Sequence, residues 1–507
     1  KEVSERFDVS FNSLSEGQRD LFCRLAVFSS SMTEEAVESI CIESADSDWQ
    51  SDLGELERMS FLDRIEISAQ DESGNETSIY RYKLHPLMRQ YAAGKAGVEL
   101  LTRLRSKAAD YFLDYASDNS DNFRMLDMEH ENLSESMDWF VGQQESSSVE
   151  ALQTAYHRFL QFLAELDSYL DKKGYWAEYH RRLLQAVAAT EALKDQSEMA
   201  GLIYKLAILA KNRGEHDAAR NFCKQSLRIY QKLGFKWGIS SSFSLFGTLA
   251  QSAGYYKAAR NLYQKSLKIN EELKDKNAMA GNLCKLGALA KDYGDYNEAR
   301  RLCQQSLKIY QEMDEMEGIA GSLLLQGTLA QDSGDYITAR DLYQQGLKIE
   351  EELEDKSRIS DFLHQIGNIE LLTGDCDAAI KHYQKSLEIA QELGDKKGMS
   401  NSLSQLGMIA QTIGDRNAAR ERYQECLEIE KKLGDKSAEA ISLHLLGTLA
   451  HDTGDYHTAH DFYQKSLEIS QKLSNQTTVA ASLYKLGEMA QDSCDYDTAR
   501  EKKKKCM

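Results

Sequence analysis

The sequence lacks the cysteine arrangements that bind metals or crosslink small domains. Its nine cysteines are scattered, with no CxxC pair and no Cys/His cluster at metal-ligand spacing. We therefore interpret them as reduced core thiols of an intracellular protein. A signal peptide and an apolar run long enough to cross a bilayer are also missing. These absences predict a soluble, cytoplasmic chain with no metal site and no membrane partner.

Positive charge is in short supply as well. Lys and Arg number 61 against 81 Asp and Glu, which gives a formal net charge of −20 and a pI near 5.1. Sequence-independent affinity for a phosphate backbone comes from Lys and Arg. The composition therefore disfavours a nucleic-acid partner.

Catalytic motifs are missing too. No GxxxxGK[ST] sequence occurs, since Gly94-Lys95 is followed by Ala96, so the segment has no loop to cradle a nucleotide's phosphates. His364 and His444 stand in equivalent repeat positions, which places them in different units and not around one metal or nucleophile. We predict that this segment is not an enzyme and holds no cofactor, and that ADP or ATP would bind elsewhere in a full-length protein.

The dominant pattern is a repeat of 40 residues. Glycine recurs in step at one position, a second glycine follows seven positions later, and an alanine follows five positions after that. The three sets are Gly247, Gly287, Gly327, Gly367, Gly407, Gly447 and Gly487; Gly214, Gly254, Gly294, Gly334, Gly374, Gly414 and Gly454; and Ala219, Ala259, Ala299, Ala339, Ala379, Ala419, Ala459 and Ala499. Such regularity indicates one supersecondary unit stacked many times, an architecture that commonly binds other molecules.

Each unit is predicted to be a helical hairpin. Within residues 281–320, apolar residues are spaced three and four apart on both sides of a turn at Gly294. Gly287 before the turn and Ala299 after it are small enough to let the two helices cross closely. Together with Cys303, these residues resemble the tetratricopeptide repeat, in a form longer than the common one of about 34 residues and without its closing proline. We expect an all-α, right-handed solenoid.

The expected domain boundaries follow from these patterns. We predict, in order, a linker from a missing upstream domain, a winged-helix domain, a helical connector, a degenerate repeat, and seven full repeats followed by an incomplete one; the ranges are 1–12, 13–105, 106–158, 159–198 and 199–507. The chain opens with Lys1, and its last unit becomes lysine-rich over 502–507. We interpret it as a segment of a longer protein or one with an altered tail, and a basic docking patch at the tail is the alternative.

The first hundred residues show the pattern of a winged helix. Ser15 and Gln18 stand at capping-box spacing at the start of an apolar face. The predicted elements are helices over 13–28, from Thr33, and over about 50–61, and strands over 62–67 and 79–84. A DNA-reading winged helix would place its third helix in a groove. That helix carries several acidic residues and only one basic residue, which disfavours a transcriptional regulator: Asp52, Glu55, Glu57 and Arg58.

The same region resembles the winged-helix part of STAND-class signalling ATPases of the NB-ARC group. The matching stretches are LSEGQRDLFCRLAVFS (14–29), LGELERMSFLDR (53–64), YKLHPLMRQYA (82–92) and EHENLSESMDWF (129–140). The resemblance implies an upstream nucleotide-binding domain, a repeat sensor after it, and self-association on activation. It also implies that His85 reaches the phosphates of ADP, a role that suits an imidazole. The alternative is that His85 merely caps the helix that Pro86, the only proline, begins.

The candidate binding surface is the exposed face of the first helix in each repeat. In this repeat class that face lines the concave groove, and residues that change from repeat to repeat are free to contact a ligand. Apolar groups clustered there would indicate binding, unless they pack on a neighbouring helix. The candidate residues are Lys285, Lys291, Leu324, Leu325, His364, Gln365, Asn368, Leu371, Leu372 and Met408.

These observations favour the sensor segment of a STAND signalling protein, in which the repeats bind a protein or peptide and the first domain relays the event to a nucleotide switch. Binding must then favour one state of the switch over the other. The alternative is a constitutive adaptor without a switch, similar to kinesin light chains.

Overall fold

The computed structural model describes residues 2–43, 48–70, 76–142, 148–353, 355–473 and 475–492. It divides into two compact units, Lys1–Tyr169 and Leu170–Met507. The lysine-rich tail and the second helix expected for the incomplete repeat lie outside the described residues.

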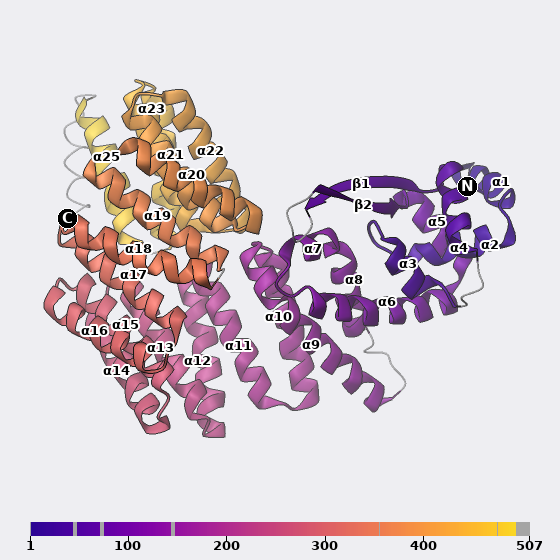
Figure 1. Cartoon of the computed structure of the whole chain (residues 1–507), viewed down its shortest axis with the longest axis horizontal. Coiled ribbons are helices and arrows are strands. Elements are labelled where there is room, and N and C mark those ends of the chain that lie inside the picture. The colour runs from indigo at the N-terminus through magenta and orange to yellow at the C-terminus, as the bar shows by residue number, and fades with distance from the viewer. Residues whose placement is uncertain are drawn as a thin grey trace. The chain divides into compact units, whose positions relative to one another are not determined.

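The first unit is mostly helical with one antiparallel strand pair (Figure 1). Its elements are α1 (Glu2–Asn12), α2 (Glu16–Arg24), a 3-10 turn η1 (Leu25–Val27), α3 (Glu34–Cys41), α4 (Trp49–Arg58), β1 (Asp63–Gln70), β2 (Glu76–Lys83), α5 (Pro86–Ala96), α6 (Val98–Asp118), α7 (Phe123–Met128), α8 (His130–Gly142) and most of α9 (Val149–Lys172). The three helices and two strands expected in the first hundred residues are all present. Ser15 and Gln18 form the expected capping box, and Thr33 caps α3. The strands pair from Asp63↔Lys83 to Gln70↔Glu76.

The region expected as a linker contains a packed helix. In α1, the Phe7 ring lies 5.5 Å and the Phe11 ring 5.7 Å from the ring of Tyr91 on α5. Asp8 accepts hydrogen bonds from the Tyr91 hydroxyl at 2.6 Å and from Lys95 at 2.7 Å. Residues 2–12 therefore belong to the first unit, and the prediction of a linker is corrected here. The contact that orders them comes from a helix about 80 residues away, so the local sequence does not reveal it.

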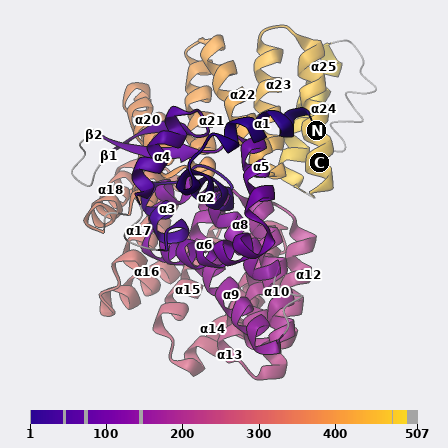
Figure 2. The same ribbon diagram turned by 90° about the vertical axis from the view of Figure 1, so that its right-hand side faces the viewer.

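The second unit is a series of helical hairpins of equal length, each lying against the next (Figures 1 and 2). The hairpins are α11 (Gln196–Asn212) with α12 (His216–Leu233), α13 (Lys236–Ser252) with α14 (Tyr256–Leu273), α15 (Lys276–Asp292) with α16 (Tyr296–Glu312), α17 (Met316–Asp332) with α18 (Tyr336–Glu352), α19 (Lys356–Thr373) with α20 (Cys376–Leu393), α21 (Lys396–Thr412) with α22 (Arg416–Leu433), and α23 (Lys436–Asp452) with α24 (Tyr456–Lys472). The single helix α25 (Gln476–Asp492) follows them, and α10 (Trp176–Leu193) precedes them. Seven hairpins are thus described where seven full repeats were expected, and the incomplete last unit stays a prediction because the position of its second helix lies outside the described residues.

The recurring small residues perform the roles that the sequence assigned to them. Gly294 adopts φ 85°, the left-handed conformation that the turn requires, and the next residue, Asp295, caps α16 by accepting from the backbone N–H of Glu298. A Cβ on Gly287 would lie 2.8 Å from Cys303 Sγ in the second helix. Glycine at this position therefore permits the close crossing within the hairpin.

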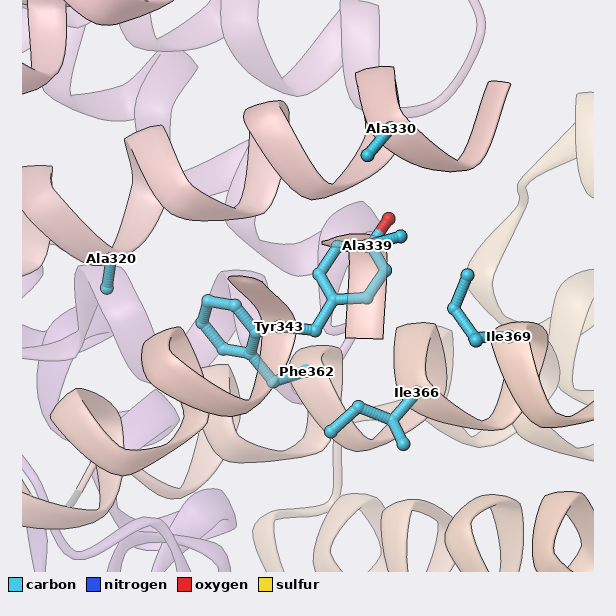
Figure 3. Close-up of a cluster of buried hydrophobic side chains, with 7 residues drawn as sticks. All are labelled: Ala320, Ala330, Ala339, Tyr343, Phe362, Ile366 and Ile369. Carbon is cyan, nitrogen blue, oxygen red and sulfur yellow. The ribbon is translucent and has the colours of Figure 1, made fainter. Parts of the chain in front are cut away.

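The core is divided among the repeats. Figure 3 shows one cluster, in which Tyr343 of α18 and Phe362 of α19 lie among alanines and isoleucines of the surrounding helices. Buried hydroxyls add a second tie within hairpins: Ser226 donates to the carbonyl of Ala200 at 2.8 Å, and Ser306 donates to that of Ala280 at 2.8 Å. In these hairpins the first helix is thus fixed to its own second helix by both packing and a hydrogen bond from a buried hydroxyl.

Candidate functional site

A row of polar links joins the C-terminal turns of successive first helices. Gln251 Nε2 donates to Asp292 Oδ2 at 2.6 Å, and Gln411 Nε2 donates to Asp452 Oδ2 at 2.7 Å. Between these positions, Lys291 forms an ion pair with Asp332 at 3.2 Å. Every link connects one residue to the residue 41 positions later, so the row runs along the same edge of the stack. Lys291, a predicted site residue, therefore has a partner within the row.

The row is interrupted by two leucines. Leu371 and Leu372 of α19 occupy the positions that hold Gln251 and Asp292 in the regular links. Leu372 is 51% exposed and Leu371 is half-buried. On the following first helix, α21, Met408 is 40% exposed and Ile413, just past its end, is 63% exposed. We call these four residues the apolar gap. It is the place where the polar edge presents apolar side chains to solvent.

Two predicted groove leucines do not belong to the exposed set. Leu324 packs against the core cluster around Tyr343, and Leu325 packs against the cluster that contains Cys303. Both side chains are only partly accessible. The interpretation of these leucines as wetted groove residues is corrected, because the adjoining helices cover them.

The polar candidates on α19 interact mainly with their own repeat. The His364 ring lies 5.2 Å from the Tyr383 ring, edge to face, and burial lowers the pKa of His364 to about 4. The Tyr383 hydroxyl donates to Asn368 Oδ1 at 2.6 Å, and Asn368 Nδ2 donates to Gln365 at 3.1 Å. Tyr383, Asn368 and Gln365 therefore form a hydrogen-bonded group. His364 lies beside it, uncharged at neutral pH, and its Nδ1 has no hydrogen-bond partner among the described residues.

The remaining candidate, Lys285, lies on a different part of the same surface. Its ammonium donates to the Ser244 hydroxyl of the preceding first helix at 2.6 Å. The structure thus does not gather all ten predicted residues into one site. It leaves an apolar gap on α19 and α21, and a lysine on α15.

His85 occupies an exposed position at the start of α5. Its Nδ1 accepts a hydrogen bond from the backbone N–H of Leu87 at 3.2 Å, and Pro86 is the first helical residue. The capping alternative is therefore correct as a description of Nδ1. Contact between the other ring nitrogen and a phosphate stays a prediction.

A buried polar network in the first unit escaped the sequence interpretation. Arg81 Nη1 and Glu129 Oε1 form an ion pair at 2.5 Å, and both side chains are at most 3% exposed. Asn132 donates to Glu129 at 2.7 Å and accepts from the backbone N–H groups of Ser29 and Ser30 at 3.0 and 3.2 Å. The network ties strand β2 to the connector helix α8. The sequence did offer one indication of this network: Arg81 lies within a strand whose residues alternate between apolar and polar.

The described ranges contain no cluster of metal-binding side chains and no helix suited to crossing a bilayer. Within them, no group of three or more His, Cys, Asp or Glu side chains is placed to hold a metal ion. None of their helices combines the length and the apolar character needed to span a bilayer.

Family comparison identifies the hairpins. Tetratricopeptide repeat families match residues 198–272, 358–432 and 438–507, and also 283–313. A search of curated proteins gave no match.

Several solved structures are similar to the chain at low sequence identity. A STAND protein with a tetratricopeptide repeat sensor from Pyrococcus horikoshii is 13% identical, with a TM-score of 0.41, over 93% of this chain and 66% of its own. A Rap protein complexed with competence and sporulation factor is 14% identical, with a TM-score of 0.49, over 73% and 99%. BtubC from P. vanneervenii is 17% identical, with a TM-score of 0.36, over 44% and 91%.

Proposed function

We propose that this chain, whose second unit is a tetratricopeptide-repeat scaffold for protein interaction, is the sensor segment of a STAND-class signalling ATPase. The repeats bind a protein or peptide, and the first unit relays that event to a nucleotide switch in an upstream domain. The STAND assignment rests on the sequence stretches that resemble this class. The binding role rests on the apolar gap.

The apolar gap carries the proposal because it lacks the polar links that are present on both sides of it. Polar links join the edge at three places. Gln331 is equivalent to Gln251 and lies 41 positions before residue 372, so an acidic residue at 372 could form a further link. Leucine at that position cannot form the polar link, and it exposes apolar surface to water. Such exposure does not stabilise an isolated chain. A partner that covers Leu372 and Met408 would recover that free energy.

The relay is supported by the buried network of Arg81, Glu129 and Asn132. A charged pair removed from water is held only when its geometry is kept, so a displacement of α8 would be resisted at β2. Strand β2 leads directly to His85, two residues after its end. Movement of the connector and the position of His85 are therefore mechanically linked within the first unit.

The binding role is tested by Leu372→Asp. The new carboxylate would face Gln331 as Asp292 faces Gln251, so the variant should fold with unchanged or slightly raised stability. A charge in the apolar contact should weaken partner binding by about tenfold or more. The measurement is binding of a phage-displayed peptide pool, selected on the unmodified protein, to each variant by biolayer interferometry.

A matched control is Ile337→Asp on α18. Ile337 is 78% exposed but belongs to a second helix, so this variant adds the same charge away from the first-helix edge and should bind normally. Equal binding by the Leu372→Asp and unmodified proteins would refute the apolar gap as the binding surface.

The switch is tested at His85 in the full-length protein with its nucleotide-binding domain. His85→Ala removes both cap and imidazole, whereas His85→Asp keeps a good cap and places a negative charge near any phosphate. Both variants should release ADP faster and raise basal signalling, but only His85→Ala should lose stability. An unchanged ADP off-rate in both variants would favour the constitutive adaptor.

A further inference from the structure

A hollow lies on the surface formed by the first helices, at a different place from the apolar gap. It has a volume of about 220 Å³ and lies between α13 and α15, with Tyr204 of α11 at one end and Tyr310 of α16 at the other. Its lining is rich in hydroxyl and amide groups, and it contains one charged side chain, Lys285. Trp237, 52% exposed, forms part of its wall.

Lys285 is the feature that defines the chemistry of the hollow. Its ammonium has a hydroxyl partner, Ser244, and no carboxylate of the described residues pairs with it. Its side chain keeps exposed surface, yet the packing of neighbouring groups around the ammonium, and then repulsion from Lys211, lowers its pKa. A cation in this state gains from a negative charge brought within hydrogen-bonding distance, because the new partner opposes both effects.

The opposing charge has to come from outside the chain. The overall charge of −20 repels acidic molecules at long range, but charges beyond about 8 Å are largely screened at physiological ionic strength. Among the described residues, Lys285 is the one charged side chain that lines the hollow. Asn282, 3% exposed, adds a wall amide whose Oδ1 lacks a hydrogen-bond donor within the described ranges and can accept from a peptide N–H, but not from a carboxylate.

The hollow continues along the surface. Asn277 and Tyr310 also line a neighbouring hollow of about 330 Å³ that extends to Arg358 on α19. Arg358 is already engaged, since its Nε lies 2.6 Å from the buried carboxylate of Glu350. An extended peptide long enough to span both hollows would place an internal side chain, and not only a terminus, within reach of Lys285.

We propose that the hollow at Lys285 is a subsite for an Asp or Glu side chain within an extended peptide, with the neighbouring residue of that peptide lying against Trp237. The inference deepens the proposed function, since it assumes that the repeats bind peptides. It assigns the ligand an acidic residue, which the apolar gap alone does not require.

The test uses fluorescein-labelled decapeptide libraries with blocked termini, in which one position is fixed as Glu, Gln, Asp or Asn. Fluorescence anisotropy should show about tenfold tighter binding for Glu or Asp at one position than for Gln or Asn. A parallel library with a free C-terminal carboxylate should gain nothing from that carboxylate.

Lys285→Leu should abolish the preference for an acidic residue. The fold accepts leucine here, because the equivalent residues Leu245 and Leu325 already occur in other repeats. Lys268→Leu on α14 removes the same charge elsewhere and should keep the preference. Lys285→Arg should restore most of it.

The possible failures are distinguishable. Peptides that bind through Leu372 without any acidic preference would overturn this inference and leave the proposed function intact. A preference that survives Lys285→Leu, or one satisfied only by the free terminus, would also overturn it. Absence of binding by every library would count against both.

Discussion

The ring of Phe362 on α19 fills the space that a side chain on Gly346 of α18 would need. A Cβ on Gly346 would lie 2.3 Å from the ring. In other repeats the two positions, 16 residues apart, hold hydrogen-bonded polar side chains: Ser386 and Ser402 are 3.0 Å apart, and Ser466 and Ser482 are 3.1 Å apart. One interface of the stack has thus exchanged a polar contact for aromatic packing.

Gly346→Ser should destabilise the protein by about 1–3 kcal/mol, since the added atoms overlap a ring that is 1% exposed. Phe362→Ser alone should cost about 3–5 kcal/mol through the cavity it leaves. The double variant restores the pair found in other repeats and should be clearly more stable than the sum of the two losses predicts. Urea unfolding of the four proteins measures this coupling, and simple additivity would contradict it.

Gly287→Leu should be far more damaging than Lys285→Leu, although the two residues lie on the same helix. A side chain on Gly287 must displace Cys303, whose Sγ would be 2.8 Å from the new Cβ, at about 1–3 kcal/mol or more. Lys285→Leu should stay within about 0.5 kcal/mol. Repeats couple mainly to neighbours, so the Gly287 variant should show a broadened or two-step melt by circular dichroism. Identical melts would mean that the two faces are wrongly assigned.

Glu129→Ala should cost about 3–5 kcal/mol, because it leaves the buried guanidinium of Arg81 without its partner. Glu55→Ala is the matched control, since the Glu55 and Arg58 side chains form an exposed ion pair at 2.7 Å and such pairs contribute about 0–1 kcal/mol. Differential scanning calorimetry compares the two variants. Equal losses would show that burial of the Arg81 pair has no energetic weight.

Asp361 should make stability depend on pH between about 4 and 6. The packing of neighbouring groups around the carboxyl, and then repulsion from Asp395, raises the pKa of Asp361 to about 6, although the side chain keeps exposed surface; the unfolded value is about 3.9. The folded state therefore holds the proton more tightly, and this group's contribution to stability falls as pH rises through that window. Asp361→Asn should melt at the same temperature as the unmodified protein near pH 4 and higher above pH 6.

Asp335→Asn gives the opposite sign as a control. Hydrogen bonds to Thr338 lower the pKa of Asp335, so its carboxylate contributes stability above the unfolded pKa and loses it as pH falls. Removing that charge should lower the melting temperature at neutral pH. A pH-independent difference for Asp361→Asn would contradict the assigned cause.

The regular part of the fold could be predicted from the sequence because the residues that form it recur at the same position in successive repeats. Gly294 and Gly287 recur in step, and repetition separates their roles in turn and crossing from chance. Ser15 and Gln18 are likewise legible, since a capping box is complete within four residues.

Features that occur once and depend on distant contacts were not predictable in the same way. Packing of Phe11 on Tyr91 orders α1, and the sequence around Phe11 does not indicate this contact. Leu325 looks like a groove residue by its spacing, yet the orientation of the adjoining helix covers it. The site was predictable only in part for this reason. The sequence located Leu372 on the correct helix, but the polar links that Leu372 interrupts could be seen only in the structure.

The 41-residue span of the polar links bears on how the chain can change length. Duplication or deletion of one whole repeat keeps the 41-residue spacing. A donor equivalent to Gln251 would then meet an acceptor equivalent to Asp292 wherever the two new neighbours carry these residues. The interface between Gly346 and Phe362 obeys a different rule, because crossover between them would set Phe362 against a serine. Rearrangement at the three linked junctions would therefore keep the polar spacing, whereas rearrangement that separates α18 from α19 would lose the fit between Gly346 and Phe362.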